Sequence, residues 1–132
     1  MNPAVAEWHR IVREHDAGAL PKLLADDVVF HSPVVHMPQR GRPAATRILA
    51  AAVHVFGNPT FRYVRELHAA NEAVLEFLVD IEDIEVNGVD MIRWNDAGQV
   101  VDFKVLIRPL QGMNVIHQKM AAMLQAHQQQ QQ

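Results

Sequence analysis

Residues 90–109 read Asp-Met-Ile-Arg-Trp-Asn-Asp-Ala-Gly-Gln-Val-Val-Asp-Phe-Lys-Val-Leu-Ile-Arg-Pro. Apolar and polar residues alternate on both sides of residues 95–98, a turn whose glycine can adopt a positive φ at no steric cost. This alternation predicts a hairpin of two antiparallel strands. Asp90 is the one carboxylate on its apolar face, where an ionised group is costly unless it has a partner or a chemical role. That face carries Asp90, Ile92, Trp94, Val101, Phe103, Val105 and Ile107.

The bulk composition is that of a single globular domain. The chain has 132 residues, of which 49% are hydrophobic and 20% charged. A net charge of −3 without a basic stripe argues against a nucleic-acid partner, and the lack of cysteine excludes disulfides and thiolate chemistry. No apolar run approaches the roughly 20 residues that cross a bilayer, and the N-terminus lacks an apolar signal core. We therefore expect a cytoplasmic protein that does not act at a membrane.

Helices dominate the first half of the chain. Apolar spacing predicts a helix over residues 4–15, followed by a short second helix that contains Leu20, Leu23 and Leu24. A β-branched and aromatic run at 28–32 predicts a short strand, which Pro33 ends. A loop with three prolines then leads to an alanine-rich helix over residues 43–56.

Strands dominate the second half. Four strand-like segments joined by short turns are expected to pair as antiparallel neighbours, and they cover residues 60–68, 72–82, 85–95 and 99–108. Asn87-Gly88 interrupts the third segment, which indicates a bulge or a local turn. A terminal helix is expected over residues 113–124, with Ile116, Met120, Met123 and Leu124 buried. Residues 1–126 then form one domain, and residues 127–132 a disordered polyglutamine tail.

Helices followed by a strand meander predict the α+β class. We expect a strongly curved antiparallel sheet with the N-terminal helices packed over its concave face, so that a cone-shaped cavity is enclosed. Phe61, Tyr63 and Leu67 share a face with Arg65, which leaves the first strand of the meander less clear. The residues expected to line a ligand pocket there are Trp8, Ile11, Phe30, Ser32, Tyr63, Phe77, Ile92, Trp94, Phe103 and Val105.

The order of elements and several motifs resemble the nuclear transport factor 2-like superfamily, in its SnoaL-like and ketosteroid isomerase-like branch. The resemblance runs from Trp8 to about Leu124. It implies a cone-shaped α+β barrel and a homodimer formed through the convex face of the sheet. The motifs that carry it lie at residues 16–20, 24–28, 31–34, 38–41, 89–94 and 98–101.

The resemblance keeps only part of the catalytic pattern. In the steroid isomerases an aspartate base, a tyrosine and an aspartic acid share the pocket, and these positions match Ser32, Ile11 and Asp90. Serine cannot abstract a carbon-bound proton unaided, and isoleucine donates no hydrogen bond. Steroid isomerisation by that mechanism is therefore not expected. For the limonene epoxide hydrolase branch, Asp90 and Arg65 could supply two members of its Asp-Arg-Asp set, and the third has no match.

Asp90 and His15 are the candidate catalytic residues. Asp90 is either an acid/base group whose pKa burial raises, or a structural carboxylate that fixes the pocket's shape. His15 ends the apolar stripe of the first helix and either pairs with Asp90 or serves as a histidine at the helix end. Ser32 is expected to be a weak polar anchor, whereas His31 and His36 are expected to be exposed. No residue spacing indicates a metal site, and no cofactor motif is present.

Two functions of different kinds remain open. The first is a cofactor-independent enzyme that acts on a small hydrophobic molecule by acid/base catalysis, as an isomerase, cyclase, dehydratase or hydrolase. The second is a non-catalytic dimeric module that binds an apolar ligand or serves as a scaffold. A roomy cavity with Asp90 near a second titratable group would favour the enzyme. A cavity closed by Trp8 and Trp94 would weaken both alternatives.

Overall fold

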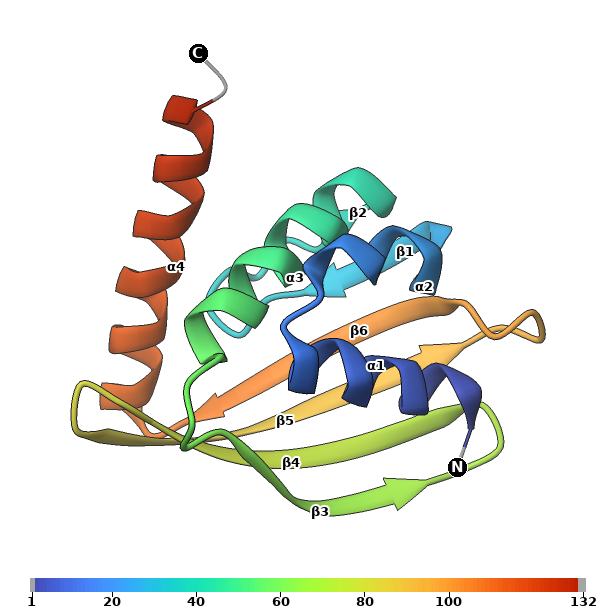
Figure 1. Ribbon diagram of the computed structural model, residues 1–132, viewed down its shortest axis with the longest axis horizontal. Helices are drawn as coiled ribbons and strands as arrows, with labels where there is room; N and C mark the ends of the chain where they lie inside the picture. Colours follow the sequence, from blue (N-terminus) through green and yellow to red (C-terminus); the bar gives the residue numbers. More distant parts are fainter. Residues whose placement is uncertain (1, 131–132) are drawn as a thin grey trace.

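The computed structural model describes the backbone of residues 2–130 and the side chains of residues 2–126 (Figure 1). The elements follow the predicted order, with helices first and a strand meander after them. They are α1 (Pro3–Glu14), a 3-10 turn η1 (Ala17–Ala19), α2 (Leu20–Leu23), β1 (Leu24–His31), β2 (Gln39–Arg40), α3 (Arg42–Phe56), β3 (Arg62–His68), β4 (Glu72–Ile81), β5 (Ile84–Trp94), β6 (Val100–Arg108) and α4 (Leu110–Gln130).

The strands form one curved, open sheet in the order β2-β1-β6-β5-β4-β3. Strands β3 to β6 are the expected antiparallel meander, but β1 joins β6 in parallel, so the sheet is mixed. Helices α1, α2 and α3 cover its concave face, and α4 stands at one end of the sheet beside α3 (Figure 1). The predicted α+β architecture is confirmed.

Helix α1 is fixed at both ends. Asn2 caps its N-terminus by accepting a hydrogen bond from the Ala4 amide at 2.7 Å, and Pro3 occupies the first turn, where its missing N–H is no loss. His15 ends the helix in a left-handed conformation at φ 54°. With both ends fixed, α1 places Trp8 over the sheet. The Trp8 ring packs edge-on against the Phe103 ring, with 4.9 Å between centroids.

Two irregularities shift the predicted strand faces. The β5–β6 ladder slips between Arg93 and Trp94, so Val100 rather than Val101 is fully buried. The β3–β4 ladder slips between Tyr63 and Arg65. Because a bulge inserts one residue, side chains beyond it change face, and Arg65 therefore lies on the side opposite Tyr63. The expectation that Tyr63 and Arg65 share a face was wrong.

Gly88 marks neither a bulge nor a turn. It pairs with Phe77 in an unbroken β4–β5 ladder. A Cβ atom at this position would lie 2.7 Å from Phe77 Cε2 and 2.9 Å from Ile107 Cδ1, so glycine makes room for both side chains. The true turn comes earlier, at Glu82 and Asp83, which have φ of 51° and 65°.

Helix α4 is longer than the sequence predicts. It begins at Leu110 rather than at 113, and its backbone continues to Gln130. Residues 127–130 were expected to be disordered, and the backbone of α4 continues through them; residues 131–132 of the predicted tail lie outside the described residues. Glutamine is a good helix former, and adding residues to a formed helix is far easier than starting one. Across residues 2–130, no helix is long and apolar enough to cross a membrane.

Candidate functional site

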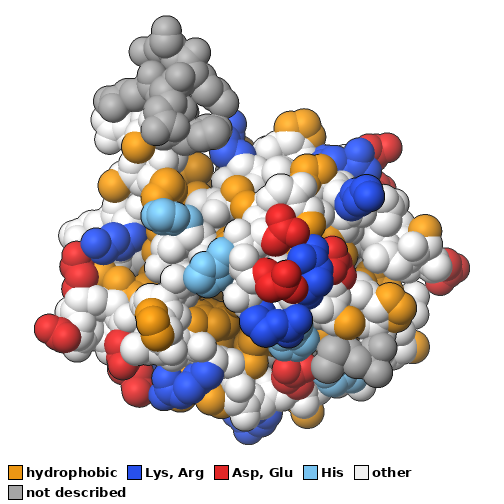
Figure 2. Space-filling model, in the orientation of Figure 1, with side chains coloured by type: hydrophobic (Ala, Val, Ile, Leu, Met, Phe, Trp, Pro, Cys, Tyr) orange, Lys and Arg blue, Asp and Glu red, His pale blue; other side chains and the backbone are white. Residues whose placement is uncertain are grey.

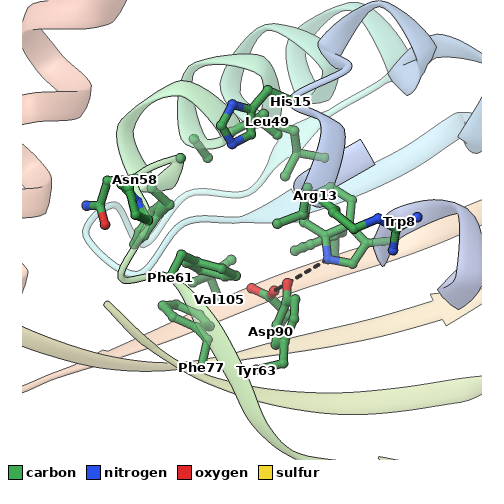
Figure 3. A pocket seen from close by; sticks show the side chains of 17 residues that line it. Trp8, Arg13, His15, Leu49, Asn58, Phe61, Tyr63, Phe77, Asp90 and Val105 are labelled. Atoms are coloured by element: carbon green, nitrogen blue, oxygen red, sulfur yellow. Dashed lines mark hydrogen bonds between the residues drawn. The ribbon is translucent and has the colours of Figure 1, made fainter. Parts of the chain in front are cut away.

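A partly enclosed cavity of about 320 Å³, here called cavity 1, lies between α1, α3 and the concave face of the sheet (Figure 3). Hydrophobic side chains form most of its wall, and Figure 2 shows them at the floor of a hollow in the surface. Its lining residues are Trp8, Val12, Arg13, His15, Leu49, Ala52, Val53, Phe56, Gly57, Asn58, Pro59, Phe61, Tyr63, Phe77, Asp90, Phe103 and Val105.

Asp90 lies in the wall of cavity 1 and is only 5% exposed. The Tyr63 hydroxyl donates a hydrogen bond to Asp90 Oδ2 at 2.6 Å, and the Trp8 indole N–H donates to the Tyr63 hydroxyl at 2.8 Å. A chain of hydrogen bonds thus runs from α1 through β3 to β5. Among the described residues, Asp90 Oδ1 accepts no hydrogen bond. One oxygen of the carboxyl group is therefore held by the Tyr63 hydroxyl.

The surroundings of Asp90 bring its titration into the neutral range. Burial raises the pKa of Asp90 to about 7, while the polar hydrogens of Tyr63 and Trp8 favour the ionised form and limit the rise. Burial and the neighbouring Asp90 carboxylate raise the pKa of Tyr63 well above its usual value. Tyr63 therefore stays protonated and keeps donating, whereas Asp90 can gain or lose a proton near pH 7.

His15 is not the partner of Asp90. It lines cavity 1 but forms no hydrogen bond to Asp90 within the described part of the chain. The ring packs against the end of α3, where a Cβ atom on Gly57 would lie 3.2 Å from His15 Nε2. Of the two alternatives for His15, the pair with Asp90 is not formed, and the hydrogen-bond partner of Asp90 is Tyr63. The helix-end alternative for His15 matches its position at the C-terminus of α1.

Arg65 does not belong to the cavity. Its guanidinium group lies on the outer side of the sheet, where Nε donates to Glu76 Oε1 at 2.9 Å. The bulge in β3 is the cause, because it turns Arg65 away from the concave face. The Asp-Arg-Asp arrangement considered for the epoxide hydrolase branch is therefore not formed by Asp90 and Arg65.

A second cavity of about 290 Å³, here called cavity 2, lies under α4. Two of the residues that were expected to line the ligand pocket line this cavity. Phe30 and Ser32 line it rather than cavity 1. The Ser32 hydroxyl accepts hydrogen bonds from the amides of Val34 at 3.1 Å and Val35 at 3.3 Å, so it holds the loop in a local turn. His31, whose side chain was expected to be exposed, is half-buried beside Asp102, with His31 Nε2 and Asp102 Oδ2 3.0 Å apart.

Some of the remaining predicted pocket residues line cavity 1, and the others lie in the hydrophobic core. Tyr63, Phe77 and Phe103 line cavity 1 together with Trp8 and Val105. Ile11, Ile92 and Trp94 are buried in the main core and are not among the residues that line either cavity. Trp94 therefore does not close cavity 1.

Sequence reasoning missed the contribution of α3 and the residues after it. Leu49, Val53 and Phe56 form one wall of cavity 1, and Phe61 stacks on Phe77 with 5.2 Å between ring centroids. The apolar stripe of α3 was visible in the sequence, but the pattern does not distinguish a cavity wall from filled core. Arg13 and Asn58 add polar groups to the wall. In the part of the chain that is described, no three His, Asp or Glu residues cluster as metal ligands do.

Comparisons with known proteins agree on the family. The SnoaL-like domain family matches residues 5–103. A steroid delta-isomerase from Pseudomonas aeruginosa is 38% identical over 94% of this chain and 90% of that chain, with a TM-score of 0.88. An uncharacterized protein with a cystatin-like fold from Silicibacter pomeroyi is 30% identical over 92% of this chain and 85% of that chain, with a TM-score of 0.85.

A more distant likeness shows the fold alone. SalBIII, an epoxide hydrolase/cyclase-like enzyme of pyran ring formation in salinomycin, is 19% identical over 81% of this chain and 89% of that chain, with a TM-score of 0.65. The comparison with curated proteins found no match. The match to the family model, the sequence identity to the steroid delta-isomerase and the structural similarity all indicate the same family. The chain therefore belongs to the SnoaL-like domain family.

Proposed function

We propose that the chain binds a small hydrophobic molecule in cavity 1 and exchanges a proton with it through Asp90. The observation that carries the proposal is a buried carboxyl group in an apolar wall, held through one oxygen by Tyr63 at 2.6 Å. An apolar cavity with few converging polar groups is typical of small-molecule sites. A titratable group with a pKa near the working pH is typical of general acid/base catalysis.

The two residues have complementary tasks. As a carboxylate, Asp90 accepts a proton from a C–H or O–H bond of the ligand and becomes the neutral acid. As the acid, it returns a proton to another atom of the same molecule, so the enzyme ends unchanged. Tyr63 stays protonated throughout and stabilises the carboxylate form through its hydrogen bond. Isomerisation moves a proton and a double bond within the ligand, whereas cyclisation, dehydration and hydration couple such proton transfers to a bond formed or broken in the ligand. Water is the only co-reactant or leaving group that these reactions require.

Similarity to a steroid delta-isomerase supports proton transfer on an apolar molecule as the reaction type. It does not support a steroid as the substrate of this chain. The base position of the steroid isomerase pattern is Ser32, whose hydroxyl faces cavity 2 and the loop amides. The tyrosine position is Ile11, which is core. Tyr63, from a different strand, instead supplies a hydroxyl to Asp90. The proposed substrate class is therefore a small hydrophobic molecule with one oxygen function.

The proposal can be tested without knowing the natural ligand. An apolar cyclic ketone such as cyclohexanone exchanges the hydrogens next to its carbonyl for deuterium when a base acts on it, and NMR in D₂O follows the exchange. The wild-type protein should accelerate this exchange, and Asp90→Asn should abolish the acceleration while the ketone still binds. Asp96→Asn, in the exposed turn, is the matched control and should behave as wild type. Full acceleration in Asp90→Asn would contradict a catalytic Asp90.

A non-catalytic ligand-binding module is the second candidate. It is favoured by the absence, within the described residues, of a second titratable group other than Tyr63 in hydrogen-bond contact with Asp90. In that case Asp90 orients the ligand's oxygen and no proton leaves the ligand. Ketone binding with no acceleration of exchange in the wild type would support this alternative and overturn the enzyme.

The outer face of the sheet supports a proposed homodimer. Met91 and Leu106 are exposed there, and each pairs across strands with a half-buried valine, Val74 and Val89 respectively. The four side chains form an apolar stripe on the convex face. Burial of such a stripe against a second copy would remove apolar surface from water.

A further inference from the structure

Cavity 2 is a separate, mostly apolar space between α3, α4 and the loop after β1. One face of α4 lines it at helical spacing, and that face consists of Ile116, His117, Met120, Ala121 and Leu124. Opposite lie Phe30 and Ile48. Figure 1 shows α4 standing beside α3, with the loop between β1 and β2 close by. A cavity of about 290 Å³ bounded by two helices and a loop is of the size that holds a small molecule.

With histidine counted as neutral, Arg47 is the only charged side chain among the residues described as lining this cavity. Arg47 from α3 and His117 from α4 line it, both are exposed, and no carboxylate is among its lining residues. Within the part of the chain with described side chains, neither forms an ion pair. The whole chain has a net charge of −3, so the positive charge in the wall of cavity 2 is opposite in sign to the net charge of the protein. An anionic group at the opening would be attracted to the guanidinium group of Arg47 and can accept a hydrogen bond from a ring N–H of His117.

We propose that cavity 2 binds a hydrophobic carboxylic acid with an unbranched chain. The apolar chain lies between α3 and α4, against Ile48, Ile116 and Met120, and the carboxylate lies at the opening between Arg47 and His117. Burial of methylene groups supplies most of the affinity, and the guanidinium group of Arg47 selects the acid over a neutral molecule of the same length.

The site does not depend on the chemistry proposed for cavity 1. Ala52, Phe56 and Val105 line both cavities and form the wall between them. The Phe56 ring in this wall packs edge-on against Phe77, with 5.4 Å between centroids. A carboxylic acid can therefore occupy cavity 2 whether or not Asp90 acts on a second molecule.

The charge selection is tested with decanoate and 1-decanol, measured by calorimetry on the full chain. Wild type should bind decanoate more tightly than 1-decanol, and Arg47→Gln should weaken decanoate binding about fivefold and leave 1-decanol unchanged. Arg62→Gln, an exposed arginine on β3 away from cavity 2, is the control and should leave both unchanged. Equal weakening of both ligands by Arg47→Gln, or no change in either, would overturn the proposed carboxylate position.

The location is tested with two neighbouring alanines of α4. Ala121 lines cavity 2, whereas Ala122, which is also exposed, does not. Ala121→Trp should reduce decanoate affinity at least tenfold, and Ala122→Trp should have no effect. Each methylene added between octanoate and decanoate should tighten binding to wild type about fourfold. Unchanged affinity in Ala121→Trp would place the acid elsewhere and overturn the proposal. An unchanged circular dichroism spectrum and urea unfolding midpoint in the same variant show that the fold is intact.

Discussion

Tyr63 and Asp90 lie on strands that are not neighbours, yet the hydroxyl of one donates to the carboxylate of the other at 2.6 Å. Strand β4 runs between them, and its Phe77 pairs with both Tyr63 and Gly88. Because the sheet is curved, side chains on its concave face converge over the intervening strand. The environment of Asp90 therefore depends on the curvature of the sheet as well as on the strand that carries it.

The buried carboxyl group predicts a pH-dependent stability. Its folded pKa of about 7 lies above the ordinary value of 3.8, so the folded state keeps a proton that the unfolded state has released. Stability should therefore fall as pH rises from about 4 to about 7, by about 4 kcal/mol at most. Asp90→Asn should remove this fall. Urea unfolding at a series of pH values measures it, with Asp96→Asn as control. Parallel pH profiles for wild type and Asp90→Asn would contradict the burial argument.

Tyr63→Phe should be most costly when Asp90 is ionised. The variant removes the hydroxyl that donates to Asp90 and accepts from Trp8, so two polar groups lose a partner. The expected loss is about 1–3 kcal/mol of unfolding free energy above pH 7, and less at pH 5, where the carboxyl group is neutral. Chemical unfolding at the two pH values gives the comparison. A loss that is larger at pH 5 would show that Tyr63 does not stabilise the carboxylate.

Gly88→Ala should change both stability and the shape of cavity 1. The added Cβ atom would meet Phe77 and Ile107, and such overpacking typically costs about 1–3 kcal/mol. Displacement of Phe77, which lines cavity 1, should also weaken cyclohexanone binding. Gly98→Ala is the control, because its Cβ atom would meet nothing within 4 Å and only its φ of 80° is unfavourable. Equal ketone affinity in the two variants would contradict the close fit at Gly88.

The apolar stripe on the convex face predicts the oligomeric state. Leu106→Glu introduces a charge at the centre of the proposed interface and should convert a dimer to a monomer, as measured by light scattering after gel filtration. Met37→Glu, in the exposed loop after β1, should leave the dimer intact. A wild-type protein that is monomeric at high micromolar concentration, or a dimer unaffected by Leu106→Glu, would rule out this interface.

Much of the fold could be predicted because strand alternation is local. The β5–β6 hairpin, the inward side of β4 and the burial of Asp90 all follow from period-2 spacing, which the structure confirms. Gly88 was misinterpreted because a glycine in a strand indicates either a bulge or a close packing contact. Only the position of Phe77 in three dimensions distinguishes the two.

The candidate site was harder to predict because it depends on tertiary packing. His15 was considered as one partner for Asp90, since both could reach one cavity, but the bulge after Tyr63 decides which side chains of β3 face inward. Nothing in the sequence places that bulge. Cavity 2 was not predicted either, because it arises where α4 packs beside α3 and neither helix alone encloses a space.

The most direct test is the titration of the Asp90 carboxyl carbon, followed by ¹³C NMR between pH 3 and pH 10. The account predicts a midpoint near 7, assigned by its absence in Asp90→Asn. Tyr63→Phe should move that midpoint upward, because the hydrogen bond favours the ionised form. A midpoint near the ordinary 3.8 would contradict the central claim that Asp90 is a buried group able to exchange a proton at neutral pH.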